Sequence, residues 1–447
     1  YRLKANEGLS FQGSIVLGMG FVLEPDEAQA LIERDPRNKD VLFPYLNGED
    51  LNSRPDQSPS RWVINFSDWP LGRFGDVLPV SGEPVVEAIR RSAPMRFDDS
   101  PVGADSRWEL PENHIDVLTG ELDKRRVEWL RLGVVPADYP GPVACDYPRV
   151  LAIAEEKVRP ERQRHKERVE EGERPFQLRY PLAERWWHFG EKRPELYGLL
   201  AEAESCLATS LVSQYFNIVR YEPGIVFAHR CAVFPKVMEG FLGVVQSSVH
   251  EVWARNYSST LESRLNYSPS DCFESFPIPG ELRAVQRAEL GFERERARLA
   301  QACPGGLTMV AQRLHRKSDD SQETDAFRMA YASLDLAVIR AYGWDDLDLN
   351  HGFHETPQGV RFTISPEARK EVLRRLLKLN HQRYAEEVAA GLHDKKGKKA
   401  TATPGSTPNR GRKPNNPTTV AEPRATYNPT PATNLFDTQL TFGEVED

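Results

Sequence analysis

The sequence has 447 residues, of which 39% are hydrophobic and 28% charged, and it carries a formal net charge of −8. This length allows two or three domains, and this composition is typical of a soluble globular protein. No run approaches the roughly 18 consecutive apolar residues of a membrane helix. The N-terminal residues also lack the apolar stretch of a signal peptide. We therefore expect a cytoplasmic protein with no membrane partner.

Cysteine usage and the first residue add two expectations. The cysteines lie far apart and none forms a C-x-x-C pair, so the sequence indicates neither a zinc site nor a disulfide framework. Free thiols in a reducing compartment are the simplest interpretation. The sequence begins at Tyr1 and not at a methionine, so we expect it to be a piece of a longer polypeptide.

The first predicted part, residues 1–150, is β-rich. Its apolar runs are short and are separated by glycines, which is typical of strands and tight bends. A short helix is predicted to begin at Glu24, where Glu-Pro-Asp-Glu precedes an apolar stretch. Residues 71–147 contain many Pro, Gly and Asp residues and favour no regular element. The predicted strands are at 14–17, 21–23, 41–46 and 62–66.

The second predicted part, residues 151–280, opens with a highly charged helix at 151–171. This helix is polar on all sides, which predicts an exposed arm or a connector. Mixed strand and helix patterns follow. They end at 276–280, where two prolines and a glycine break both kinds of element.

The third predicted part, residues 281–392, is helical, and residues 393–447 form a fourth, different part. The latter combine lysines and arginines with Pro, Thr, Asn and Gly, so they bury too little apolar surface to fold and are predicted to be a disordered basic tail. The fold class is therefore α+β, a mixed α/β module followed by a helical C-terminal region. The helices of the third part are predicted at 281–302, 325–341 and 366–391.

The net negative charge alone argues against nucleic-acid binding, but the basic residues are clustered beside aromatic ones. Arginine can donate paired hydrogen bonds to guanine or phosphate, Asn and Gln can recognise adenine, and aromatic rings can stack. The alternative is that the aromatic residues belong to the core, with arginines at its rim. The candidate DNA-binding residues are Gln12, Ser14, Arg61, Trp62, Asn65, Arg185, Trp186, Trp187, Arg220, His229, Arg230 and Lys236.

Motifs for catalysis are absent from the sequence. Gly13, Gly18 and Gly20 follow a β-like segment, but their spacing differs from G-x-G-x-x-G, so bends or close backbone approach are favoured over a nucleotide-binding loop. There is no Asn-Pro-Pro-aromatic turn, which methyltransferases use to accept the amine of an extruded base. No zinc-protease, P-loop or serine-hydrolase motif is present either. We therefore predict no catalytic residue and no metal ligand in this segment.

Several long blocks resemble one known family. The sequence SFQGSIVLGMGF at 10–21 is similar to the opening of the target-recognition region in large adenine-specific DNA methyltransferases. These are the type IIG and type IIL restriction–modification enzymes and their phage-defence relatives. The resemblance covers residues 8–390. The other blocks that carry it are 38–51, 61–66, 180–187, 266–277, 341–347 and 377–383.

The resemblance implies a role in DNA sequence recognition. In this family an upstream domain binds S-adenosylmethionine and methylates adenine at its exocyclic amine. Because the catalytic motifs are absent here, the resemblance implies that methyl transfer belongs to a domain of the parent chain or to a partner subunit. The expected partners are double-stranded DNA, that catalytic domain and further defence-system proteins. We expect this segment to bind no cofactor and the parent methyltransferase to bind S-adenosylmethionine.

Two other interpretations remain open at this stage. The net acidity and the locally apolar residues 434–442 favour a scaffold that joins a defence complex through protein contacts and does not read DNA. Alternatively, the glycines at 13–20 are a degenerate loop of a free-standing methyltransferase. That interpretation predicts S-adenosylmethionine binding by residues 1–447 alone.

Overall fold

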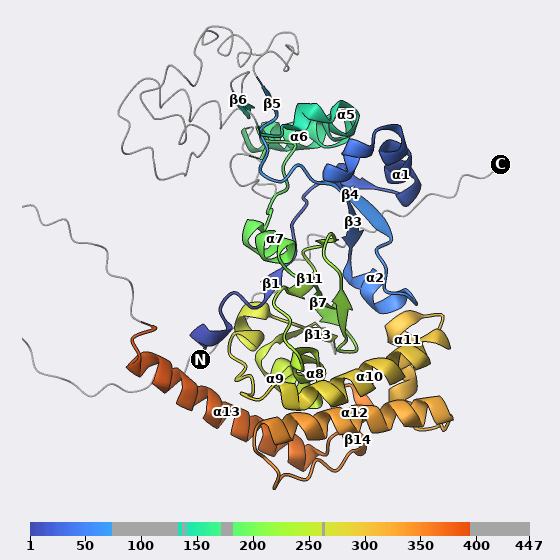
Figure 1. Cartoon of the computed structure of the whole chain (residues 1–447), viewed down its shortest axis with the longest axis vertical. Helices are drawn as coiled ribbons and strands as arrows, with labels where there is room; N and C mark the ends of the chain where they lie inside the picture. The colour runs from blue at the N-terminus through green and yellow to red at the C-terminus, as the bar shows by residue number, and fades with distance from the viewer. Residues whose placement is uncertain (74–132, 136–138, 140, 171–181, 262–263, 394–447) are drawn as a thin grey trace, which may run out of the picture. The chain divides into compact units, whose positions relative to one another are not determined.

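Two four-stranded sheets organise the chain in the computed structural model (Figure 1). The structure describes residues 1–73, 133–135, 139, 141–170, 182–261 and 264–393. These residues belong to one compact unit, Tyr1–Asp394. Apart from His393, the predicted tail at 393–447 lies outside the described residues, as does most of 71–147.

The first sheet has the strand order β10-β3-β4-β2. Strand β3 pairs with β4 in antiparallel register, Tyr45 opposite Arg61, and with β10 in parallel register, Tyr45 opposite Val226. This parallel pair brings together two segments that are far apart in the sequence. The strands of this sheet are β2 (Val22–Leu23), β3 (Leu42–Leu46), β4 (Arg61–Ile64) and β10 (Val226–Phe227).

The second sheet has the order β1-β11-β7-β9, and all its pairs are antiparallel. Phe11 lies opposite Val233, so a short N-terminal strand closes one edge of a sheet built from much later residues. The turn at residues 228–230 joins this sheet to the first one, because it connects β10 directly to β11. The strands are β1 (Phe11–Gln12), β7 (Cys206–Ser210), β9 (Ile218–Tyr221) and β11 (Cys231–Phe234).

Smaller sheets complete the β structure of the described residues. Strands β12 (Ser259–Leu261) and β13 (Arg264–Asn266) pair with β8 (Val212–Ser213), and β14 (Gly352–Thr356) and β15 (Gly359–Thr363) form a hairpin. Strand β5 (Gly72–Arg73) pairs with β6 (Val134–Val135).

Two of the helices show how the sequence sets a helix end. Helix α1 starts with Pro25, and the Glu27 side chain accepts a hydrogen bond from the Glu24 backbone. Helix α13 starts after Ser365, whose hydroxyl accepts from Ala368, and Gly391 follows its end with a φ of 73°. The helices are α1 (Pro25–Arg34), α2 (Gly48–Ser53), α5 (Pro148–Lys157), α6 (Arg159–Glu170), α7 (Pro194–Ala201), α8 (Phe241–Gln246), α9 (Ser248–Tyr257), α10 (Arg283–Gln301), α11 (Gly306–His315), α12 (Gln322–Ala341) and α13 (Pro366–Ala389).

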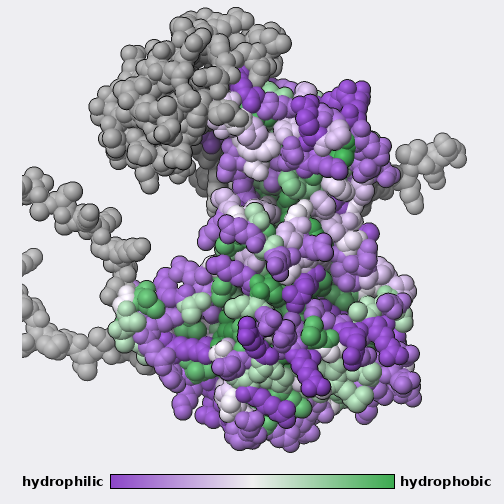
Figure 2. Space-filling view, viewed as in Figure 1, coloured by the Kyte–Doolittle hydropathy of each residue, from purple (hydrophilic) through white to green (hydrophobic). Residues whose placement is uncertain are grey.

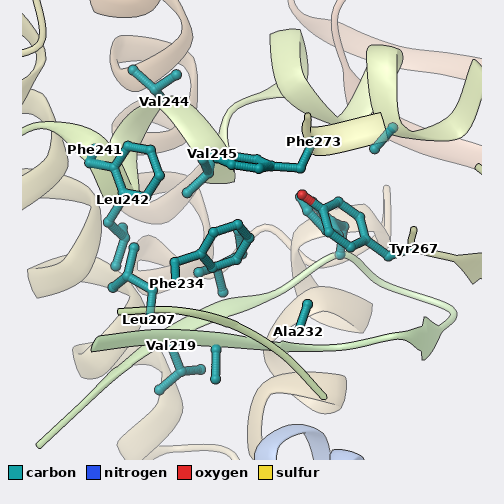
Figure 3. Packing of buried hydrophobic residues seen from close by; sticks show 14 of the residues in the cluster. Leu207, Val219, Ala232, Phe234, Phe241, Leu242, Val244, Val245, Tyr267 and Phe273 are labelled. Atoms are coloured by element: carbon teal, nitrogen blue, oxygen red, sulfur yellow. The ribbon is translucent and has the colours of Figure 1, made fainter. Parts of the chain in front are cut away.

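The larger hydrophobic core packs the second sheet against the helices that follow it. Phe234 of β11 contacts Phe241 of α8 and Phe273 edge to face, with ring centroids 6.0 and 5.0 Å apart (Figure 3). Phe292 of α10 and Tyr331 of α12 extend the same core. The sheet and the C-terminal helices are therefore packed as one body.

A second hydrophobic core lies between the first sheet, α1 and α5. It contains Phe21, Val63, Val150 and Trp187, all fully or almost fully buried. Because its members come from both sides of residue 150, the cores do not follow the predicted part boundaries, and the boundaries stay a prediction.

Several predicted elements are confirmed, and three expectations are corrected. The predicted helix at 151–171 is two helices, because Pro160 lacks the N–H that would continue α5. The expected exposure of this arm is wrong at Arg162, which is 2% exposed. Residues 14–17 form only isolated bridges at Ser14 and Ile15, not a strand.

The predicted α+β class is confirmed. In the described ranges, no helix combines the length and the apolar character needed to cross a bilayer. The cysteines are free thiols, and all except Cys145 are buried. The surface seen in Figure 2 is mainly hydrophilic, with smaller apolar areas between the polar ones.

Candidate nucleic-acid interface

Three predicted residues meet at the turn between β10 and β11. Gln12 donates a hydrogen bond from Nε2 to the carbonyl oxygen of His229 at 2.6 Å. Arg230 is next in the turn and is exposed. Arg193 donates from Nη2 to the side-chain oxygen of Gln12 at 3.4 Å, although its stronger partner is Glu191 at 2.6 Å. We call Gln12, Arg193, His229 and Arg230 the turn group.

The turn group combines two guanidinium groups with a neutral imidazole. Burial and, to a smaller extent, the charge of Arg230 lower the pKa of His229 below its usual value. The ring is therefore uncharged at neutral pH and offers one donor and one acceptor. An exposed arginine beside such a ring suits a surface that meets both phosphates and base edges.

Arg61 lies at the same end of the first sheet as the turn group. Strand β10 runs parallel to β3 and leads into His229, whereas β4 runs antiparallel and starts with Arg61. Two strand spacings, roughly 10 Å, separate β4 from β10. Arg61 is exposed and pairs with Glu24 on the surface. Such exposed ion pairs contribute little stability, so the guanidinium can exchange its partner for a phosphate.

Trp62 and Asn65 do not join the turn group. Trp62 follows Arg61 on β4, is partly buried and packs against the second core. Asn65 lies beyond the opposite end of β4, where its backbone N–H donates to Val41 and its side-chain oxygen accepts from Ser67 at 2.9 Å.

Ser14 is the clearest correction among the predicted contacts. It is 0% exposed, and its hydroxyl donates to Tyr197 at 3.1 Å and to the Lys192 carbonyl oxygen at 3.3 Å. Its backbone N–H donates to Phe227, which holds the N-terminal segment against β10. Ser14 therefore positions the turn group from beneath and is not itself on the surface.

The aromatic pair Trp186 and Trp187 also belongs to the interior. They are 6% and 1% exposed, and Nε1 of Trp187 donates to the Trp69 carbonyl oxygen at 2.9 Å. The alternative from the sequence, aromatic core residues with arginines at the rim, describes this segment well. Arg185 is partly buried beside them, and its carbonyl oxygen accepts from Arg162.

Arg220 and Lys236 lie away from the turn group. Arg220 is on β9, the opposite edge of the second sheet from β1, and it pairs with the buried Glu289 of α10 at 2.9 Å. This ion pair links the sheet to the helical region. Lys236 follows β11 and is exposed, so it stays a candidate for a separate phosphate contact.

The glycines at 13–20 serve backbone packing. A Cβ atom at Gly13 would lie 2.2 Å from the Ala228 carbonyl oxygen, and one at Gly20 would lie 2.6 Å from Cβ of Lys157. Gly18 has a φ of 139°, which L-residues rarely adopt. These contacts support close backbone approach within the fold, the structural interpretation of the three glycines.

Arg193 belongs to this surface but is not among the DNA-binding residues predicted from the sequence. The basic pair Lys192-Arg193 directly before Pro194 is the signal, because proline at the first turn of α7 fixes the preceding residue outside the helix. Among the described residues, no group of three or more His, Cys, Asp or Glu side chains is placed to hold a metal ion.

The fold and the surface define a class of protein: an α+β module, built on sheets, that presents basic side chains on a turn between two sheets. Residues 160–280 match the family model described as MmeI, target recognition domain. This range contains the β10–β11 turn, and the match confirms the resemblance for this region.

Among the similar solved structures is a chain described as the type IIL restriction-modification enzyme MmeI in complex with DNA. The likeness has a TM-score of 0.43 and 15% sequence identity, and it covers 84% of this chain and 35% of that one. This chain therefore spans little more than a third of that enzyme. No curated protein matches the sequence. The identification rests on the family match at 160–280.

Proposed function

We propose that this chain selects the DNA site for a restriction–modification enzyme and that the turn group is part of its DNA-contacting surface. The observation that carries the proposal is the family match at 160–280, a range that contains Arg193, His229 and Arg230. Gln12 and Arg61 are brought to the same region by strand pairing. The roughly 10 Å between β4 and β10 is comparable with the width of a major groove, about 12 Å.

Each member of this surface has a distinct part in the proposal. The exposed guanidinium groups of Arg61 and Arg230 bind phosphates and set the register of the protein on the duplex. Gln12 and the neutral His229 offer donors and acceptors to base edges, and each well-formed pair discriminates by about 1–3 kcal/mol. Ser14 and the glycines fix the backbone beneath them.

Methyl transfer belongs, in this proposal, to another part of the parent protein. The sequence carries no turn that accepts the amine of an extruded base. An S-adenosylmethionine-dependent domain, in the same polypeptide or in a partner subunit, would methylate the exocyclic amine of adenine. The chain described here would supply the site selection and no cofactor contact.

The test is selection from a library of duplexes with a randomised centre, using the purified 447-residue chain at low and moderate salt. We expect enrichment of one short sequence and an affinity that falls as salt rises, because counterions are released when phosphates are bound. Binding without enrichment would reduce the chain to a non-specific basic surface. Absence of binding at low salt would overturn the proposal.

A protein-binding role has one observation in its favour. Leu290 of α10 and Met329 and Leu336 of α12 are 58%, 66% and 38% exposed, so these two packed helices leave large apolar side chains uncovered. Substituting Leu290 and Met329 with glutamine would leave site selection unchanged and weaken assembly with the catalytic part. Lost site selection in this variant would instead place these helices in the DNA surface.

A further inference from the structure

A cavity of about 400 Å³ lies where residues 214–217, α9, α11, α12, the β14–β15 hairpin and α13 meet. Its size falls within the range of small-molecule sites, roughly 300–1,000 Å³. It shares no residue with the turn group. The cavity is therefore not part of the proposed DNA-contacting turn group.

The inner lining of the cavity is aromatic. Phe216, Phe292, Phe327 and Tyr331 line it and are each 6% exposed or less. Such ring faces and edges favour a flat apolar body over a flexible polar one. The wall thus suits a planar ring system.

Two buried polar atoms of the lining lack a hydrogen-bond partner. Nη1 of Arg255 is a donor without an acceptor, while Nε of the same side chain donates to Glu251 at 2.7 Å. Nδ1 of His315 is also unpartnered. Burial, followed by the nearby charge of Arg361, lowers the pKa of His315 to about 4, so the ring is neutral at neutral pH. In the tautomer of the neutral ring that carries its proton on Nε2, Nδ1 is an acceptor.

The lining thus offers an unpartnered donor at Arg255 and an unpartnered nitrogen at His315. A heterocycle with an acceptor and a donor on its edge complements the two. Buried polar groups without partners are costly, so a ligand that pairs with them binds more tightly than one that does not. A nucleobase has this edge and this flat shape. A purely aliphatic or purely aromatic ligand satisfies neither atom.

The charged side chains around the cavity favour an anion. Arg255, Arg361, Arg369 and Lys370 line it, against the single carboxylate of Glu251. The guanidinium of Arg361 lies 4.4 Å above the Tyr215 ring, which itself stacks on His315, so it is held in place at the cavity. Lys370 is exposed and Arg369 is half-buried, which puts positive charge toward solvent and the aromatic rings inside. This arrangement suits a phosphate attached to a planar base.

We propose that this cavity binds a nucleoside phosphate, with the base among the aromatic side chains and the phosphate at Arg361, Arg369 and Lys370. The same chemistry is offered by a free mononucleotide and by the phosphorylated end of a single DNA strand. Arg361 and Arg369 act as the phosphate contacts, and Arg255 and His315 pair with the base edge. The proposal does not depend on duplex recognition by the turn group.

Titration calorimetry of the full chain tests it with adenosine monophosphate, adenosine, inorganic phosphate and a short 5′-phosphorylated oligonucleotide. We expect adenosine monophosphate to bind at least about tenfold more tightly than adenosine or phosphate alone, because only it meets both halves of the site. Equal binding of inorganic phosphate would overturn the nucleoside part. Absence of binding by both nucleotide ligands would overturn the site.

Variants connect the binding to these residues. Arg361→Gln and Arg369→Gln should each weaken nucleotide binding about tenfold or more, whereas Arg298→Gln on the exposed face of α10 should not change it. Thermal unfolding confirms that each variant is folded. If a folded Arg361→Gln/Arg369→Gln double variant bound as tightly as the unsubstituted chain, the assignment would be wrong. If the oligonucleotide competes and outbinds the mononucleotide through the same residues, the site is assigned to a DNA strand end.

Discussion

Nη1 of Arg162 donates a hydrogen bond to the carbonyl oxygen of His188 at 2.7 Å, inside the second hydrophobic core. Nη2 of the same guanidinium donates to the Leu17 carbonyl oxygen at 2.9 Å. The guanidinium also lies 5.3 Å from the Phe21 ring centroid. One buried arginine thereby connects helix α6 to the glycine-rich segment and to the segment at 182–188. The partners of its guanidinium are backbone carbonyl oxygens and not a carboxylate.

Arg162→Met should lower the free energy of unfolding by roughly 2–4 kcal/mol, because several buried carbonyl oxygens lose their donor while the methylene stem is kept. Arg164→Met on the same helix is the matched control. Arg164 is exposed and its Nε bonds only within the helix, so a change below about 0.5 kcal/mol is expected. Urea unfolding followed by circular dichroism measures both, and equal effects of the two variants would contradict this role.

The sequence predicted elements whose evidence is local. Helices α1, α10, α12 and α13 were predicted within a few residues, because their periodicity and their caps are contained in each segment. Strands β3 and β4 carry the same kind of signal. Helix α11 and the β14–β15 hairpin were not predicted, although Gly359 marks the turn of the hairpin with a φ of 92°.

What the sequence could not predict depends on distant pairing. Strand β1 has two residues, and only its partner Val233, far along the chain, makes it a strand. Arg162 looks like one more exposed charge in a polar helix until the carbonyl oxygens that surround it are known. For the same reason the candidate site residues separate, because Gln12 bonds to His229 whereas Arg220 pairs with Glu289 of α10.

Arg220→Ala should affect stability more than DNA binding. It removes the partner of Glu289, which is 3% exposed and whose pKa is raised by burial. Because Arg220 is itself about one-third exposed, the loss should be modest, about 1–2 kcal/mol. Arg287→Ala, at an exposed position on α10, the helix that carries Glu289, should have no measurable effect on stability. A variant with unchanged unfolding but weaker duplex binding would return Arg220 to the DNA surface.

Gly13→Ala and Gly198→Ala should change stability in opposite directions. At Gly13 the added methyl would meet the backbone oxygens of Ala228 and Phe227 at 2.2 and 2.5 Å, so we expect a loss above about 2 kcal/mol. At Gly198, within α7, nothing lies within 4 Å, and alanine should stabilise the helix by up to about 1 kcal/mol. Melting temperatures compare the pair. A harmless Gly13→Ala would show that the close approach is not needed.

Acid should destabilise the fold through three buried histidines. Burial is the main cause that lowers the pKa of His188 and His250 to about 3 and that of His315 to about 4. The unfolded chain therefore takes up these protons near pH 6.5, before the folded chain does, so stability is lost as pH falls from about 6.5 toward 4. As the pH falls from about 7.5 to about 5.5, each histidine should lower the free energy of unfolding by about 1 kcal/mol.

His188→Gln separates this effect from general acid sensitivity. The glutamine can still donate to the Trp69 carbonyl oxygen, which His188 contacts at 2.7 Å, but it cannot be protonated. The pH dependence of unfolding should decrease by about one histidine's share. An unaltered slope in His188→Gln would exclude His188 as a source.

Arg230→Ala should weaken duplex binding about equally for all sequences and reduce the salt slope by about one phosphate contact, if this guanidinium binds the backbone as proposed. Arg61→Ala should act in the same way, because it lies at the same end of the first sheet. Gln12→Ala should instead relax the preference for particular bases while the salt slope stays the same.

The matched control for these variants is Arg294→Ala. Arg294 is on α10, its side chain is 77% exposed, and it carries the same charge far from the turn group. Fluorescence anisotropy at several salt concentrations measures all four proteins. Each of the three arginine substitutions removes one positive charge. If all three weakened duplex binding equally, the effect would come from net charge alone. A selective effect of Arg61 and Arg230 assigns the contact to the end of the first sheet, where β4 starts and β10 turns into β11.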